Sequence, residues 1–464
     1  MKKISYFILA IGLALGIASC EKMLEYPPEG AILAEDALKT PDDAQRLLNS
    51  CYDVIANLFD GKYQNICELM SDNMAEPNGL DFNAVYNRET NFFTPTTNGT
   101  YGDFYYAIYR CNSLMKNFDL IEGLSDVERT RMEAEAKFIR AFCHFSVVKI
   151  WAQPYGSTPT NSHLGIILKR DASNEPLARS TVEESYAFII EDLMYAYNNL
   201  ADNNGNYATK NAAAGLLGMV YFQMNNYTKA VEYVNYAIGA PDEVPFYQMS
   251  DTLDRFPENP GENPEIIFGV VSSNPGANHI DQRTDNFIGN YNAGGVLPPN
   301  LMLSNELYQF TSLNSADDRL GWMQSSGGKY KNRRFEDKVF FNIPIIYLTE
   351  LKLIRAECLG EMGGDLSVAI ADINAIRDRA FGVGLNDLST SSTASEVIVA
   401  ARREYRIETM GEGKWIDQLK RIGAKGENIV VRNAPWNCPG MALQFPNSEF
   451  TSALFVGNPE GGCN

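Results

Sequence analysis

The sequence predicts a mainly α-helical protein: a tetratricopeptide-like solenoid of about four helix pairs, interrupted by a loop-rich region with minor β-structure. Three observations predict this fold. A long two-faced helix is indicated by residues 125–151, one helix-pair repeat lies within residues 211–241, and a degenerate second copy spans residues 347–380. Such helices must cover their apolar stripes with one another, and stacked helix pairs do so.

The long helix is the most strongly patterned stretch of the chain. Apolar residues recur at steps of three and four along one face: Ala134, Phe138, Ala141, Phe145, Val148 and Ala152. Glu128 follows Ser125 at capping-box distance, so the helix is expected to begin there. Pro154 and Gly156 are expected to close it, because proline cannot continue a helix.

The repeats are identified by small residues at fixed spacing. Five positions of the first copy match the tetratricopeptide pattern, and Pro241 lies close to its final proline; they are Leu217, Gly218, Tyr221, Ala230 and Ala237. Similar places in the second copy are taken by Ala356, Leu359, Ala369 and Ile373. Gly363 and Gly364 are expected to make the turn between its two helices.

The other elements follow from caps and composition. Helices are expected at residues 41–58 behind the cap Thr40, near Cys67, at 101–118, and after caps at Ser180 and Thr393. Residues 71–100 are predicted to form a long functional loop. Short β-prone runs lie at residues 266–271 and 338–342, on either side of a Gly/Asn/Pro-rich loop at 272–300.

The N-terminus predicts export. Lys2 and Lys3 precede an apolar run, and Ile17-Ala18-Ser19-Cys20 is similar to a bacterial lipobox. Residues 1–19 are therefore predicted to be a signal peptide, and Cys20 to be acylated and to anchor the mature protein. Ordinary secretion, with Cys20 incidental, is the alternative. No later stretch of the sequence approaches spanning length.

Charge and cysteine content exclude several classes of function. The net charge is −19, and loss of the two lysines in residues 1–19 makes it −21, which argues against nucleic acid and anionic membranes as partners. Seven cysteines remain beside Cys20, and none shows the CxxC spacing of a zinc or redox site. Cys438 and Cys463 are an open candidate for one disulfide near the C-terminus.

The residue types favour binding over catalysis. There are only three histidines, and no GxSxG elbow, HExxH pair or P-loop occurs, so we predict that the protein is not an enzyme. Aromatic rings beside Asn, Asp and Arg suit sugars, which carry apolar C–H faces and many hydroxyls. The candidate ligand residues are Asn73, Arg88, Phe93, Tyr101, Asp281, Arg283, Tyr291 and Trp322. For each aromatic, burial in the core is the alternative.

Several stretches in the same order resemble the SusD/RagB family of outer-membrane lipoproteins. They are the lipobox at Cys20, EAEAKFIRAFCHFSVVKIWAQPYG (133–156), YLTELKLIRAECL (347–359) and ARREYRIETMGEGKWIDQLKR (401–421). The segment 443–449 resembles the family's closing FPIP-x-x-E motif but departs from it. The resemblance implies one SusD-like domain over residues 20–464, with helix pairs within about 101–240 and 345–425 and a ligand face within about 60–100 and 242–342.

The resemblance also implies a function. Members are glycan-binding lipoproteins at the cell surface that pass oligosaccharides to a SusC-like TonB-dependent barrel in the outer membrane. Some members bind peptides, so a peptide ligand stays an alternative here, as do a tetratricopeptide-like scaffold without a small ligand and a lipoprotein glycosidase. No cofactor is expected, and the sequence leaves a structural Ca²⁺ ion open.

Overall fold

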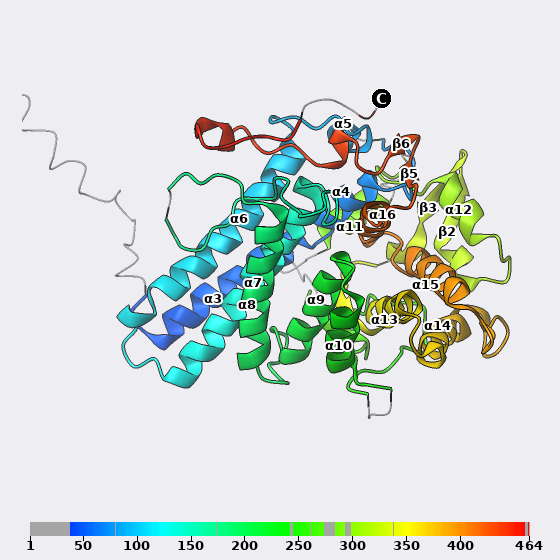
Figure 1. The fold of residues 1–464 in the computed structure, drawn as a ribbon, viewed down its shortest axis with the longest axis horizontal. Coiled ribbons are helices and arrows are strands. Elements are labelled where there is room, and N and C mark those ends of the chain that lie inside the picture. Colours follow the sequence, from blue (N-terminus) through cyan, green and yellow to red (C-terminus); the bar gives the residue numbers. More distant parts are fainter. Residues whose placement is uncertain are drawn as a thin grey trace, which may run out of the picture.

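The computed structural model describes residues 38–78, 80–173, 175–241, 245–259, 261–272, 284–292, 298–336, 338–459 and 463. Cys20 and the predicted signal peptide lie outside these residues. The long helices up to residue 381 follow one another broadly from left to right across Figure 1, and the last two, within residues 394–424, turn back toward the centre. They are α3 (Pro41–Leu58), α6 (Pro95–Lys116), α7 (Asp126–Trp151), α8 (Val182–Asn199), α9 (Lys210–Gln223), α10 (Tyr227–Ile238), α13 (Leu348–Met362), α14 (Leu366–Phe381), α15 (Ala394–Glu408) and α16 (Trp415–Ala424).

The long helix α7 forms as its pattern predicts. Ser125 caps it through a capping box with Glu128, and the helix ends at Trp151, just before Pro154. Phe138 and Phe145 are buried, and the ring of Phe138 packs edge-on against Phe268 at 5.0 Å. The helix α3 begins behind a second capping box, formed by Thr40 and Asp43.

The two helix pairs α9/α10 and α13/α14 depend on glycine at close contacts. A Cβ atom at Gly218 would lie 2.7 Å from Cγ2 of Val234, so only glycine lets α9 and α10 approach this closely. Gly363 ends α13 in the left-handed region, at φ 62°, which turns the chain into α14. The predicted mainly α, tetratricopeptide-like fold is confirmed.

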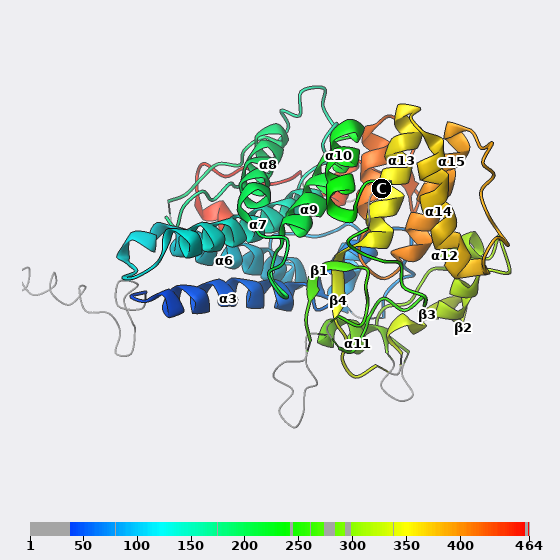
Figure 2. The same cartoon turned by 90° about the horizontal axis from the view of Figure 1, so that it is seen from below.

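The first four strands lie on one side of the row of helices, the lower side in Figure 2. Strand β1 (Ile266–Val270) pairs antiparallel with β4 (Ile343–Tyr347), and β2 (Met323–Ser326) pairs with β3 (Lys329–Asn332) through a Gly327-Gly328 turn. A third pair joins β5 (Val430–Val431) to β6 (Ala434–Pro435). The remaining elements are α4 (Lys62–Met70), α5 (Leu80–Tyr86), α11 (Asp285–Tyr291), α12 (Asn305–Thr311), η1 (Phe118–Leu120), η2 (Asp318–Trp322), η3 (Arg333–Phe335), η4 (Pro439–Met441) and η5 (Glu449–Thr451).

Three sequence-based boundaries were wrong. The β-prone run 338–342 is not a strand, because the chain there is held by side-chain contacts such as Lys338 to Asp254, and pairing begins at Ile343. Residues 71–100 are not one long loop, since they contain α5 and the first turns of α6. The cap of α8 is Thr181 with Glu184, one residue later than predicted.

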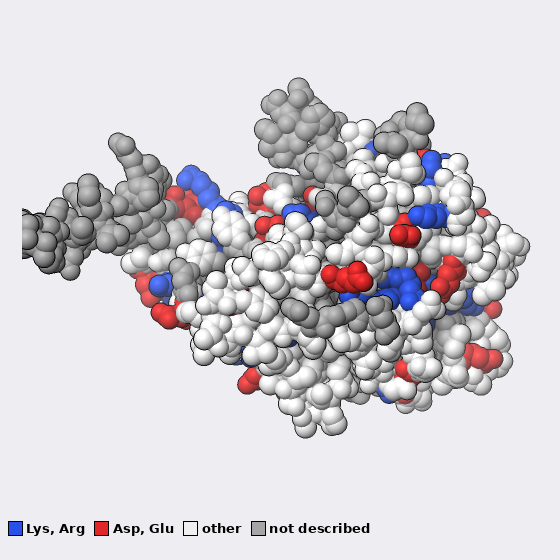
Figure 3. Space-filling model, turned by 90° about the horizontal axis from the view of Figure 1, so that it is seen from above, with Lys and Arg blue, Asp and Glu red and all other residues white. Residues whose placement is uncertain are grey.

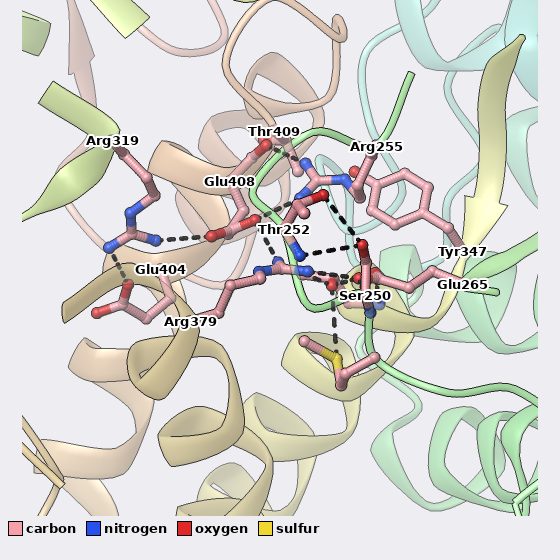
Figure 4. Close-up of polar contacts among 12 residues, drawn as sticks. Ser250, Thr252, Arg255, Glu265, Arg319, Tyr347, Arg379, Glu404, Glu408 and Thr409 are labelled. Carbon is pink, nitrogen blue, oxygen red and sulfur yellow. Dashed lines mark hydrogen bonds and ion pairs between the residues drawn. The ribbon is translucent and has the colours of Figure 1, made fainter. Parts of the chain in front are cut away.

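A buried ion-pair network joins the short elements to α14 and α15 (Figure 4). The carboxylate of Glu408 on α15 receives guanidinium groups of Arg255, Arg319 and Arg379; the last two lie at 2.9 Å. Arg319 also pairs with Glu404 at 2.6 Å, and Arg379 pairs with Glu265. Burial opposes the charge on Glu408, but the three guanidinium groups outweigh it and hold the pKa of this carboxyl well below its usual range.

The C-terminal segment, residues 437–459, crosses the end of α7 along the upper edge of the view in Figure 1. The amide of Leu443 donates to the carbonyl of Ile150 at 2.8 Å, and Nε1 of Trp151 donates to the carbonyl of Gln444 at 3.2 Å. Cys438 and Cys463 form a disulfide, which confirms the open candidate. In the described part of the chain, no helix is both long enough and apolar enough to span a bilayer.

Candidate functional site

The C-terminal segment and the start of α6 together build an aromatic rim at the surface. The amide of Asn447 donates to the carbonyl of Phe92 at 3.1 Å, which holds the segment against the turn before α6. The rings of Phe92 and Phe93 lie 4.4 Å apart, and Phe92 lies 5.8 Å from Phe450. Phe93 is 68% exposed and Phe450 42%, so this rim offers apolar ring faces to solvent.

Beside the rim lies a cleft of about 380 Å³, which we name the Tyr109 cleft. Its walls come from α6, from the loop between α7 and α8, and from the C-terminal segment around η5. The lining residues are Tyr105, Tyr109, Ile167, Lys169, Asp171, Ser173, Glu175, Pro176, Leu177, Ser448, Glu449, Thr451 and Ser452. This volume is within the range of small-molecule sites.

The side chains of the cleft are fixed by contacts behind it. The hydroxyl of Tyr105 donates to the carbonyl of Ile167 at 2.7 Å, which ties α6 to the wall opposite. Lys169 donates through Nζ to the carbonyl of Glu175 at 2.8 Å and shapes the loop between α7 and α8. Arg179 lies over the ring of Phe445 at 4.5 Å and supports the C-terminal wall from below.

Glu449 is the half-buried carboxyl of the cleft. Burial raises its pKa, while the nearby hydroxyl of Tyr101 and the charge of Lys169 act in the opposite direction. Burial also raises the pKa of the Tyr105 hydroxyl, which stays neutral at physiological pH. The cleft therefore offers hydroxyl groups, the carboxyls of Asp171, Glu175 and Glu449 and one ammonium around one exposed ring, Tyr109, which is 46% exposed.

This arrangement suits a neutral ligand rich in hydroxyl groups. A ring face takes up C–H groups, and the surrounding polar side chains accept and donate hydrogen bonds. Figure 3 shows the molecule from above: most of the visible surface is uncharged, and basic and acidic side chains lie next to each other in small mixed groups. No field of one sign is visible on this face that would select a highly charged ligand.

The structure does not bring together those sequence-predicted residues that it describes. Asn73 is buried and accepts a hydrogen bond from Nε of Arg406 at 2.9 Å; Arg88 is buried and donates to the carbonyl of Val431. Tyr291 is buried 5.2 Å from the ring of Phe335. These three side chains support loops from within, and a ligand could reach them only if those loops moved.

The other predicted residues fall into three groups. Phe93 is exposed on the rim, and Tyr101 is buried directly behind the cleft, 4.5 Å from Tyr105. Trp322 is half-buried beneath Arg334, whose guanidinium lies 4.4 Å from its ring. Asp281 and Arg283 lie outside the described residues. Ligand contact stays a prediction at every one of these positions.

Tyr109 and Glu449 were not among the sequence-predicted residues. The sequence does contain a signal for Tyr109, because Tyr101, Tyr105 and Tyr109 recur at steps of four and must share one face of α6. Glu449 ends the segment that resembles the family's closing motif, but its position against α6 depends on a contact across more than 300 residues. Among the described residues, no cluster of three or more His, Cys, Asp or Glu could hold a metal ion.

Two family models match the chain. One, described as "Starch-binding associating with outer membrane", matches residues 34–222, and one described as the SusD family matches residues 322–449. Together they match more than half of the chain, in the same order as the resembling stretches. The chain belongs to the SusD/RagB family.

Curated relatives carry the same family name. SusD-like protein P2 of Formosa agariphila is 24% identical over 480 residues, which cover 91% of each chain. SusD-like protein P25 of the same organism is 25% identical over 285 residues, and this match spans about half of the relative, 52% of its length. A SusD-like protein of Bacteroides ovatus is 32% identical over 126 residues.

Solved structures confirm the SusD-like fold. A SusD superfamily protein of Bacteroides thetaiotaomicron superposes with a TM-score of 0.79 at 21% identity, covering 91% of this chain and 100% of that one. A structure described as a laminarin-binding SusD-like protein superposes with a TM-score of 0.70 at 21% identity, covering 91% and 99%. At this level of identity the likeness concerns the fold alone.

Proposed function

We propose that this SusD-family protein captures oligosaccharides at the bacterial cell surface and delivers them to a SusC-like TonB-dependent transporter in the outer membrane. Cys20 carries the lipid that anchors it there. The observation that carries the proposal is the Tyr109 cleft, in which one exposed ring is surrounded by hydroxyl, carboxyl and ammonium groups. Laminarin binding by a protein of the same fold supports a glycan as ligand.

The expected mode of binding follows from the positions of the side chains. A sugar ring lies on the exposed face of Tyr109, and its hydroxyls bond to Glu449, Lys169 and the hydroxyls of η5. The exposed aromatic rim around Phe93 lies next to this cleft along the C-terminal segment and extends the surface for a longer chain. The ligand is held by many weak contacts, as uptake requires, because a cargo must also be released.

Isothermal titration of the mature chain, residues 20–464, with laminarin- and starch-derived oligosaccharides tests the proposal. We expect binding by the native protein and at least tenfold weaker binding by Tyr109→Ala, a change of about 1.4 kcal/mol. Tyr106→Ala is the matched control, since Tyr106 lies on the same helix and is 48% exposed but does not line the cleft. Equal affinities of the two variants for the glycan would rule out the Tyr109 cleft as its binding site.

The alternatives give different results in the same preparation. Heat with peptides and none with glycans would establish the peptide-binding alternative. The release of reducing sugar from laminarin or starch would establish a glycosidase, for which Glu449 with its raised pKa is the candidate acid. Co-purification of a large outer-membrane barrel with no affinity for either ligand class would establish a scaffold. Delivery itself is tested by oligosaccharide uptake in cells that lack this protein.

A further inference from the structure

The charges that line the Tyr109 cleft are unequal. The lining contains three carboxyl groups, on Asp171, Glu175 and Glu449, but only one ammonium group, on Lys169. Among the described residues, the cleft therefore presents more negative than positive charge to whatever enters it. Oligosaccharides that share one backbone and differ only in charge should differ in their affinity for it.

The ammonium group is bound to its own loop. Nζ of Lys169 donates to the carbonyl of Glu175 at 2.8 Å and to that of Ser173 at 3.4 Å. An ammonium has three N–H donors, so these two bonds leave one of them for a ligand. An acidic sugar would have to compete with the loop for the one cation of the described lining.

The carboxyl groups are not neutralised by ion pairs. In the described part of the chain, no Lys or Arg side chain forms a salt bridge with Asp171, Glu175 or Glu449. Arg170, which precedes the first of them in sequence, pairs with Glu191 at 3.5 Å instead. Asp171 and Glu175 are exposed, so a ligand in the cleft can reach both.

Asp171 is held in its charged form. The amide of Ser173 donates to its carboxylate at 2.8 Å. This bond keeps the pKa of Asp171 below its ordinary value, and the charges of Lys169 and Lys116 act in the same direction from farther away. The carboxylate is thus ionised and fixed in place before a ligand arrives, and it keeps lone pairs that a further donor can use.

A buried hydroxyl lies behind Glu449. The side chain of Tyr101 is 2% exposed, and its hydroxyl has no hydrogen-bond partner among the described residues, although it lies near enough to Glu449 to act on the pKa of that carboxyl. Buried polar groups without a partner are rare, so this end of the cleft points to a group that a ligand supplies. A protonated amino group carries three donors and can serve the carboxyl and the hydroxyl together.

We propose that the Tyr109 cleft selects oligosaccharides by charge: it binds a sugar chain that carries protonated amino groups more tightly than the same chain with hydroxyls, and it rejects the same chain with carboxylates. The inference rests on the proposed glycan capture and names the class of glycan that this site prefers, the amino sugars. An ammonium is attracted by all three carboxyl groups, whereas a carboxylate is repelled by them, and both effects grow where the cleft excludes water.

Three forms of the laminarin- and starch-derived tetrasaccharides test this inference. One form is unmodified, one carries an amino group in place of the hydroxyl at C6 of every glucose, and one is oxidised there to a carboxylate. Isothermal titration of the mature chain at neutral pH compares them. We expect the amino form to bind at least tenfold more tightly than the unmodified form, and the carboxylate form at least tenfold more weakly.

The possible results separate this inference from the proposed function. Equal affinities of the three forms, or a preference for the carboxylate form, would overturn the selection by charge and leave glycan capture standing. No binding of any form would overturn both.

Variants distinguish the cleft from the negative charge of the whole protein, which attracts any cation. Asp171→Asn combined with Glu175→Gln removes two charges from the cleft and keeps an acceptor for the amide of Ser173. We expect the preference for the amino form over the unmodified form to fall at least fivefold. Glu122→Gln combined with Asp202→Asn is the matched control, since both carboxyls are exposed and neither lines the cleft. An equal fall in both double variants would overturn the inference.

Discussion

Glu68 is a carboxyl group buried at the contact between α4 and the turn that precedes α16. Its Oε1 accepts a hydrogen bond from the amide of Gly413 at 2.8 Å. Burial raises its pKa to about 7, in spite of this bond and the nearby side chain of Asn73; the neighbouring charge of Glu412 adds to the rise. The folded protein therefore holds a proton on Glu68 that the unfolded chain gives up near its ordinary value of 4.5.

This group predicts a specific dependence of stability on pH. Because the pKa is higher in the folded state, the stabilisation by Glu68 is complete below pH 4.5 and is lost as the pH rises through about 7. The loss amounts to roughly 3 kcal/mol. We expect Glu68→Gln to remove this part of the pH dependence. In urea denaturation, the free energy of unfolding of the variant should therefore rise relative to that of the native protein between pH 5 and pH 8.

The carboxyls of Glu408 and Glu404 in the ion-pair network have lowered pKa values, so their effect on stability has the opposite pH dependence. They stabilise the fold at higher pH and lose this contribution as the pH falls. The difference between Glu68→Gln and the native protein isolates Glu68 from them. Glu122→Gln, at an exposed carboxyl, is the control and should leave the profile unchanged. A constant difference between Glu68→Gln and native protein across this pH range would contradict the prediction.

At the scale of elements, the disulfide between Cys438 and Cys463 secures the segment that completes the Tyr109 cleft. The bond closes a loop of 25 residues, and the same segment supplies Ser448, Glu449 and Thr451. We expect Cys463→Ser to lower the free energy of unfolding by roughly 3 kcal/mol, because the unfolded chain loses a constraint of this length. Differential scanning calorimetry with and without reductant measures this loss of stability.

The variant should also bind glycans more weakly, since the wall of the cleft is less well held, while far-ultraviolet circular dichroism stays that of the native helices. Reductant should lower the melting temperature of the native protein and leave that of Cys463→Ser unchanged. A native protein that is insensitive to reductant, with its thiols shown to be reduced, would refute the structural role of the bond.

Three helix starts with local signals were predictable to the residue. The capping boxes at Thr40, Ser125 and Thr393 lie within four residues of sequence, and each places a helix start correctly. The start of α6 could not be predicted, because its first turns are rich in Thr, Asn and Gly and no side chain caps it; the side chain of Asn98 donates to the carbonyl of Phe92 instead. β4 is buried on both faces, so it shows no alternation.

The candidate site was harder to predict than the fold for a physical reason. Tyr109 and Glu449 come from segments more than 300 residues apart, and neither has a neighbour in sequence that reveals its partner. The polar and aromatic composition of residues 71–100 pointed to a surface loop, but Asn73 and Arg88 use their polar groups to satisfy buried backbone and side chains. Composition alone cannot separate these two uses of a polar residue.

At the scale of the whole molecule, we predict that a lipid on Cys20 anchors the protein in the outer membrane. We expect the native protein expressed in its own host to incorporate labelled palmitate and to sediment with the outer membrane, because several acyl chains hold a protein firmly. Cys20→Ser should incorporate no label and leave the membrane fraction. Proteolysis of intact cells reports whether the protein is exposed at the cell surface. A native protein that incorporates no labelled palmitate would contradict the lipid anchor.

The ion pairs of Glu408 predict which residues change together in related proteins. Three guanidinium groups from distant parts of the chain converge on it out of contact with water, so replacing Glu408 removes one carboxylate partner from all three buried arginines at once, at a cost of about 3–5 kcal/mol. Related chains that keep this fold should therefore retain or exchange positions 255, 319, 379 and 408 as a set. The segments that carry Arg255 and Arg319 are then expected to be inherited together with the helices α14 and α15.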